Sequence, residues 1–125
     1  MAVDTQGLPH AIGITTADVT DRQGALQIFI KENKRLSGVK SVLVDGGYSG
    51  ASFTQSVEEI LGAQVQVAKR SALHTFSVIP ERWVDERSLG WLEKCRRLWK
   101  NCERTLHASL HRVILAFISL LLRRT

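Results

Sequence analysis

The chain has 125 residues, of which 44% are hydrophobic and only two are proline. This length and composition fit one ordered domain and exclude a chain too polar to form a core. The formal net charge is +5, and the excess lies in residues 81–125, with ten Lys+Arg and five Asp+Glu against seven of each in residues 1–80. We therefore expect a polyanionic partner that contacts the carboxyl-terminal part.

The amino-terminal residues predict a hairpin followed by a helix. Turn residues at Gly7-Leu8-Pro9 separate two short extended pieces within residues 1–15. Thr20 or Asp21 can cap a helix that ends near Ser37-Gly38.

A strand–helix–strand unit follows. The short apolar run at 41–45 is rich in β-branched residues and predicts a buried strand. Apolar residues at helical spacing predict a helix over 52–61, and Gly62 ends it before the alternating strand 63–69. This order implies parallel pairing of the two strands.

The remaining chain predicts a loop and two helices. The loop covers residues 70–80 and ends at Pro80, and a helix begins at Glu81. A second helix begins at about Thr105 with one broad apolar stripe, comprising Leu106, Leu110, Val113, Ile114, Phe117 and Leu121. We expect residues 1–80 to form the sheet with its helices, and residues 81–125 to form a helical segment. The fold class is therefore α/β, with a mixed sheet covered by helices.

Membrane spanning and secretion are not predicted. The apolar run at 113–122 has ten residues, well short of the roughly 20 that cross a bilayer, so a core helix is favoured and an interfacial helix is the alternative. The amino end lacks a secretory signal, so we expect a cytoplasmic protein.

The cysteines and histidines do not predict a zinc site. Cys95 and Cys102 are seven residues apart, without paired CxxC spacing, and we expect reduced, buried thiols. His107 and His111 lie four apart on one helix face without a third ligand, which favours a surface or interface role.

Two carboxylates are candidates for metal chemistry on DNA. Asp45 ends an apolar strand and precedes two glycines, and Glu86 lies among arginines on a helix. Two acids at one edge of a sheet can share divalent metal, which activates a nucleophile for phosphodiester cleavage. The alternatives are that Asp45 caps the Gly46-Gly47 turn and that Glu86 forms an ion pair.

Basic and aromatic residues in the same region suggest contact with nucleic acid. Trp83, Trp91 and Trp99 are eight residues apart, which puts them on one slowly drifting helix face that is more typical of a core than of base stacking. The cations that could bind phosphates are Arg82, Arg87, Lys94, Arg96, Arg97, Lys100 and Arg104.

Three segments carry a resemblance to a known family. They are VDTQGLPHAIGITTADVTDRQGA at 3–25, VLVDGGYSG at 42–50 and VIPERWVDERSLGWLEKCRRLWKNCER at 78–104. They resemble, in order, the hairpin region, the strand of the second acid and the segment of the final glutamate in DDE transposases of bacterial insertion sequences. The resemblance covers nearly the whole chain and implies an RNase H-like (ribonuclease H-like) fold.

The resemblance also implies roles for individual residues. Asp45 would be the second metal-binding acid and Glu86 the third, with Mg²⁺ or Mn²⁺ as cofactor, and Arg82 with Lys94 would neighbour substrate phosphates. The first acid of the family lies on a strand upstream of the hairpin, in a segment that this chain does not contain, and Asp4 matches a strand beyond it. Asp85 departs from the family pattern, in which an apolar residue more often precedes the glutamate.

These implications favour a carboxyl-terminal transposase piece that keeps two of three acids, lacks the amino-terminal catalytic strand and DNA-binding region, and is inactive alone. Its expected partners are DNA at insertion-sequence ends and either itself or an upstream transposase fragment, without a membrane or small-molecule cofactor. The alternative is a non-catalytic DNA-binding or regulatory module. A third reading is a decayed reading frame that makes no stable protein.

Overall fold

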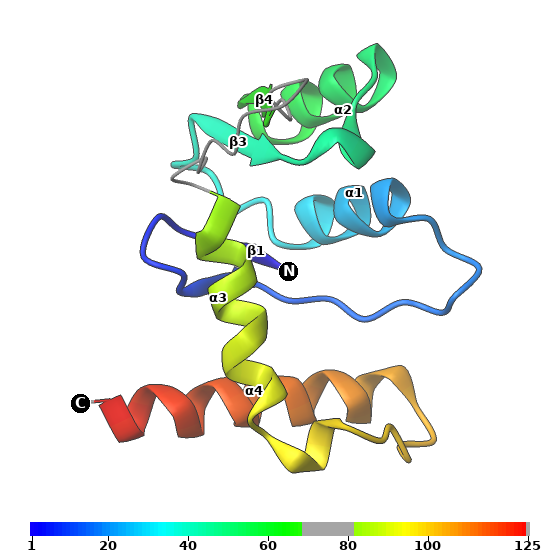
Figure 1. The fold of residues 1–125 in the computed structure, drawn as a ribbon. Coiled ribbons are helices and arrows are strands. Elements are labelled where there is room, and N and C mark those ends of the chain that lie inside the picture. The colour runs from blue at the N-terminus through cyan, green and yellow to red at the C-terminus, as the bar shows by residue number, and fades with distance from the viewer. Residues whose placement is uncertain (69–81, 125) are drawn as a thin grey trace, which may run out of the picture.

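The computed structural model describes residues 1–68 and 82–124, apart from the side chains of Arg82, Trp83 and Asp85. These residues form a mixture of helices and small sheets (Figure 1). In chain order the elements are β1 (Ala2–Val3), β2 (Pro9–Ala11), α1 (Asp21–Lys31), β3 (Ser41–Val44), the 3₁₀ helix η1 (Gly46–Tyr48), α2 (Ala51–Leu61), β4 (Gln64–Val67), α3 (Arg82–Glu93), the 3₁₀ helix η2 (Arg96–Leu98) and α4 (Leu106–Arg124). The predicted loop at 70–80 and helix start at Glu81 lie outside the described residues.

The predicted amino-terminal hairpin is confirmed. β1 pairs with β2 antiparallel, with Ala2 opposite Ala11. The second strand ends at Ala11, so Ile12 and Ile14 follow it as irregular chain.

The predicted start of the first helix is confirmed by a capping box. The Thr20 side chain accepts a hydrogen bond from the Gln23 backbone N–H, and the Gln23 side chain accepts one from the Thr20 N–H. Together they satisfy two of the donors that a helix start leaves unpaired. The helix ends at Lys31, earlier than predicted, because residues 32–38 form turns that bring Leu36 into the core at 4% exposure.

The predicted strand–helix–strand unit is confirmed, including its parallel pairing. β3 and β4 pair in register from Ser41 opposite Gln64 to Val44 opposite Val67. Gly62 ends α2 in the left-handed conformation, with φ of 64°, which glycine adopts without steric cost. The prediction of a buried strand holds for one face only, because Leu43 on the other face is 40% exposed.

The strands form two separate sheets, which corrects the expectation of one mixed sheet. β1 and β2 make one two-stranded sheet, and β3 and β4 make the other. Both nevertheless contribute to one core, where Phe29, Phe53 and Val57 are buried and the strand residues Ala2, Ala11, Val42, Val44 and Val65 pack with them. Among the described residues no strand bridges the two pairs.

The inward face of α3 contains one apolar and one polar residue. Val84 and Ser88 are buried, at 7% and 0% exposure, whereas Leu89 is 48% exposed. α3 ends at Glu93, so the prediction that Trp99 shares a helix face with the other tryptophans is wrong. The Trp99 indole N–H donates to the Glu93 carbonyl at 2.5 Å and so satisfies an acceptor that the helix end leaves open.

α4 confirms the last predicted helix and extends beyond the apolar run at 113–122 at both ends. It has 19 residues and is apolar enough to cross a membrane by length and composition alone, which is weak evidence. Phe117 is buried at 2% exposure, while Leu106, which the predicted stripe includes, is 46% exposed. α4 contacts α3, and the Arg124 guanidinium lies 3.9 Å from the centre of the Trp91 ring. The absence of a membrane partner stays a prediction.

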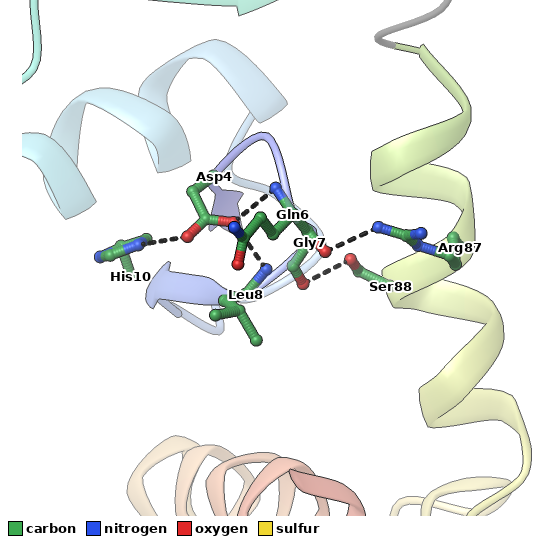
Figure 2. A network of polar contacts seen from close by, with 7 residues as sticks. All are labelled: Asp4, Gln6, Gly7, Leu8, His10, Arg87 and Ser88. Carbon is green, nitrogen blue, oxygen red and sulfur yellow. Dashed lines mark hydrogen bonds and ion pairs between the residues drawn. The ribbon is translucent and has the colours of Figure 1, made fainter. Parts of the chain in front are cut away.

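A pair of hydrogen bonds fastens the hairpin to α3 (Figure 2). The Ser88 hydroxyl lies 2.7 Å from the Gly7 carbonyl oxygen, and the Arg87 guanidinium donates to the Gln6 carbonyl at 2.6 Å. Gly7 has φ of +84°, and a Cβ there would meet the Ser88 hydroxyl at 2.8 Å, so glycine is needed for this close approach. The bonds join residues 81 positions apart in the sequence.

Replacing Ser88 with alanine tests how far this contact stabilises the fold. We expect Ser88→Ala to lower the free energy of unfolding by about 1–3 kcal/mol, because it leaves the Gly7 carbonyl without its buried donor. Urea denaturation measures the change. Ser56→Ala is the matched control. Each hydroxyl bonds the carbonyl one turn back in its helix, that of Val84 for Ser88 and that of Ser52 for Ser56, but the bond of Ser56 is exposed. Equal destabilisation by the two variants would contradict this role.

Candidate functional site

Asp45 directly follows β3 and is exposed. One carboxylate oxygen, Oδ1, accepts a hydrogen bond from the Gly47 N–H at 3.0 Å and caps η1. Arg22 of α1 donates to the Gly47 carbonyl at 2.9 Å, so the turn after Asp45 is tied to a helix. The capping geometry expected of a turn residue is therefore present, and it leaves the carboxylate at the carboxyl end of the strand.

Glu86 lies near the beginning of α3, on its exposed side. The two residues that follow it, Arg87 and Ser88, are those that bond the hairpin. The backbone that carries Glu86 is therefore positioned by the hairpin turn.

The described residues do not gather a complete metal-binding cluster. No group of three or more His, Cys, Asp or Glu side chains within residues 1–68 and 82–124 is arranged to hold a metal ion. Exposed carboxylates such as Asp45 and Glu86 supply the oxygen donors that Mg²⁺ prefers, and Mg²⁺ usually keeps several waters beside one or two carboxylates. The donor type of these two residues therefore fits a divalent ion.

The carboxylate of Asp4 holds the hairpin turn together, so Asp4 does not take the place of the first acid. Oδ1 accepts hydrogen bonds from the N–H groups of Gln6 at 2.8 Å and Leu8 at 3.0 Å, and Oδ2 lies 3.0 Å from His10 Nε2 (Figure 2). Burial raises the pKa of this carboxyl, but the hydrogen bonds from His10 and the two backbone groups outweigh it and leave the pKa below 3.8. The charged form is therefore part of the folded turn.

Some of the predicted DNA-binding cations make contacts within the fold, and others are exposed. Arg87 is half-buried, bonds Gln6 and lies over the Trp91 ring, with its guanidinium carbon 5.2 Å from the ring centre. Arg97 forms an ion pair with Glu103, whose carboxylate also lies 3.3 Å from Arg112. Lys94, Arg96, Lys100 and Arg104 are exposed on the segment between α3 and α4. The side chain of Arg82 lies outside what the structure describes.

The comparison with known proteins gives the family. The model of the transposase DDE domain matches residues 1–122. The chain belongs to this family. No curated protein and no solved structure matches it.

In the described part of this transposase domain, no cysteine or histidine belongs to a cluster of three or more side chains that could hold a metal ion. Cys95 and Cys102 are free, as expected, but Cys102 is exposed and Cys95 half-buried, so the prediction of buried thiols is wrong. Both lie between α3 and α4. The rings of His107 and His111 contact each other with centres 4.2 Å apart on exposed positions of α4.

Sequence reasoning missed two features of the transposase domain. The contact of Ser88 was not predicted, because a serine in a helix usually points to solvent and the acceptor of this one lies 81 residues away. Trp99 was assigned to a helix face, although it is 70% exposed beyond the end of α3. Neither glycine nor proline lies at residues 91–98 to signal that helix end.

Asp4→Asn tests the charged turn through the pH dependence of stability. A lowered pKa means that the folded chain binds fewer protons at Asp4 than the unfolded chain. The stabilisation is therefore present above the ordinary value of 3.8 and is lost as the pH falls through the folded pKa. We expect the stability of the wild type to fall more steeply than that of Asp4→Asn between about pH 5 and about pH 2. Urea denaturation across this range measures both slopes, and equal slopes would contradict the assignment.

Proposed function

We propose that the chain acts in DNA transposition, as part of an insertion-sequence transposase that cuts and joins phosphodiesters at the ends of the element. The observation that carries this proposal is the family match over residues 1–122. The exposed carboxylate of Asp45 at the end of β3 and the exposed Glu86 on α3 support it.

We infer that the two sheets are parts of one RNase H-like sheet. An antiparallel hairpin followed by a parallel strand–helix–strand unit is the order that supports this inference. Both sheets pack on a common core around Phe29 and Phe53. A strand that carries the first acid, inserted between β1 and β3, would join the sheets and bring that acid beside Asp45.

In this proposal Asp45 and Glu86 are two of the ligands of Mg²⁺ or Mn²⁺. A bound divalent ion would activate the attacking oxygen and stabilise the leaving oxygen of the phosphodiester. Asp45 contributes a carboxylate whose backbone is held by the turn at Gly47, and Glu86 contributes one whose helix is held by the hairpin. With only these two acids, the chain is proposed to be catalytically inactive alone.

The DNA backbone is proposed to bind the exposed cations between α3 and α4. Lys94, Arg96 and Lys100 are exposed there, and the Glu103 carboxylate nearby is paired by Arg97 and Arg112. Phosphate binding to such cations releases counterions, so affinity falls with salt. Arg87 is left out of this set because the fold uses its guanidinium.

A non-catalytic DNA-binding or regulatory module is the second candidate. The observation that favours it is that no cluster of three metal-ligating residues forms among the described residues, while the exposed cations are present. Such a module would bind the ends of the element and compete with the complete enzyme.

Cleavage and binding measured side by side test these functions. We expect the purified chain with Mg²⁺ or Mn²⁺ to bind DNA of the element ends without cutting it. Each of Lys94→Gln, Arg96→Gln and Lys100→Gln should reduce the slope of log affinity against log salt by about 0.9. Strand cleavage by the chain alone that requires Asp45 and Glu86 would contradict the inactivity.

Addition of the polypeptide encoded immediately upstream separates the two candidates. If it supplies the first acid, we expect cleavage that is lost in Asp45→Ala and in Glu86→Ala but kept in the control Glu58→Ala, which changes an exposed acid on α2. Persistent binding without cleavage, unchanged by Asp45→Ala and Glu86→Ala, would favour the regulatory module.

A further inference from the structure

Trp99 is exposed to an extent that is unusual for a tryptophan. Its exposed fraction is 70%, and it is the only aromatic residue among the large hydrophobic side chains exposed on the described chain. Trp91, by contrast, is half-buried, and the guanidinium groups of Arg87 and Arg124 both lie close to its ring. An indole ring that is left in water keeps its aromatic face available to a partner.

The exposed indole is held in place by the chain around it. Its N–H donates to the Glu93 carbonyl at the end of α3, which fixes one edge of the ring. The following residues are anchored to α4, because Asn101 Oδ1 accepts from the Ser109 hydroxyl at 3.1 Å and Arg112 lies 3.3 Å from Glu103. A ring fixed by its edge can present a face to a ligand with little loss of conformational entropy.

Exposed cations lie on both sides of Trp99 in the sequence. Residues 94–104 contain five Lys+Arg and one acid, Glu103, and that acid is paired by Arg97 and Arg112. Glu93, which is exposed, is the other carboxylate adjacent to the segment. A net positive segment with an exposed aromatic ring has the two features that single-stranded nucleic acid binds, a charged track for phosphates and a face for bases.

We propose that Trp99 stacks on an unpaired DNA base while Lys94, Arg96, Lys100 and Arg104 bind the flanking phosphates. This inference rests on the proposed DNA function and adds that the bound DNA is locally unpaired. In a duplex the base faces are already stacked on one another, so a fixed indole gains a base only where a strand is single or a base is turned out. The cations disfavour an apolar protein surface as the occupant of this site.

Binding of the full chain to three labelled probes tests the proposal by fluorescence anisotropy. The probes are a 15-nucleotide oligothymidine, an abasic strand of equal charge and a duplex. We expect Trp99→Leu to weaken binding of oligothymidine about tenfold and Trp99→Phe to retain more of it, because stacking requires an aromatic face. The affinities for the abasic strand and the duplex should change less than about twofold in either variant.

A control variant separates base stacking by Trp99 from the proposed DNA function on which it rests. Lys100→Gln should weaken binding of all three probes, because it removes a phosphate contact. Unchanged oligothymidine binding in Trp99→Leu, or an equal loss for all three probes, would overturn the stacking and leave the DNA function standing. A wild-type chain that binds none of the probes would overturn both.

A second measurement keeps Trp99, so it does not depend on whether Trp99→Leu and Trp99→Phe fold. In Trp83→Phe with Trp91→Phe, Trp99 is the only tryptophan, and its fluorescence reports the ring directly. We expect quenching by oligothymidine and none by the abasic strand. Equal responses to the two strands would overturn the proposal.

Discussion

The bonds between the hairpin turn and α3 connect the two ends of this chain. Ser88 and Arg87 reach the carbonyl groups of Gly7 and Gln6, and α3 in turn contacts α4. Besides these bonds, the helix that carries Glu86 contacts β1, η2 and α4. The position of the proposed third acid therefore depends on a glycine turn near the amino terminus.

The sequence predicted those elements whose signals are local. The capping box at Thr20, the left-handed Gly62 and the alternation around Val65 each act within a few residues. Parallel pairing of the two strands also followed, since a strand–helix–strand unit leaves few alternatives. The place of Asp45 at a strand end was predictable for the same reason.

The features that the sequence did not predict depend on contacts between distant residues. Ser88 is buried where its hydroxyl reaches the Gly7 carbonyl, and the end of α3 at Glu93 is capped by Trp99 from beyond the helix. The separation of the strands into two sheets is also a tertiary property, because the residue pattern of a strand does not show which strand lies beside it. For the candidate site, residue types could be read from the sequence, but which cations serve the fold could not.

The central claim is that Asp45 and Glu86 bind the same divalent ion. Iron-directed cleavage of the polypeptide measures this most directly, because Fe²⁺ that replaces Mg²⁺ generates radicals with ascorbate and peroxide that cut the backbone close to the metal. The account predicts cuts in two segments, one beside Asp45 and one beside Glu86, with both suppressed by excess Mg²⁺ and by either alanine substitution. Cuts beside only one of the two residues, or cuts insensitive to Asp45→Ala and Glu86→Ala, would contradict it.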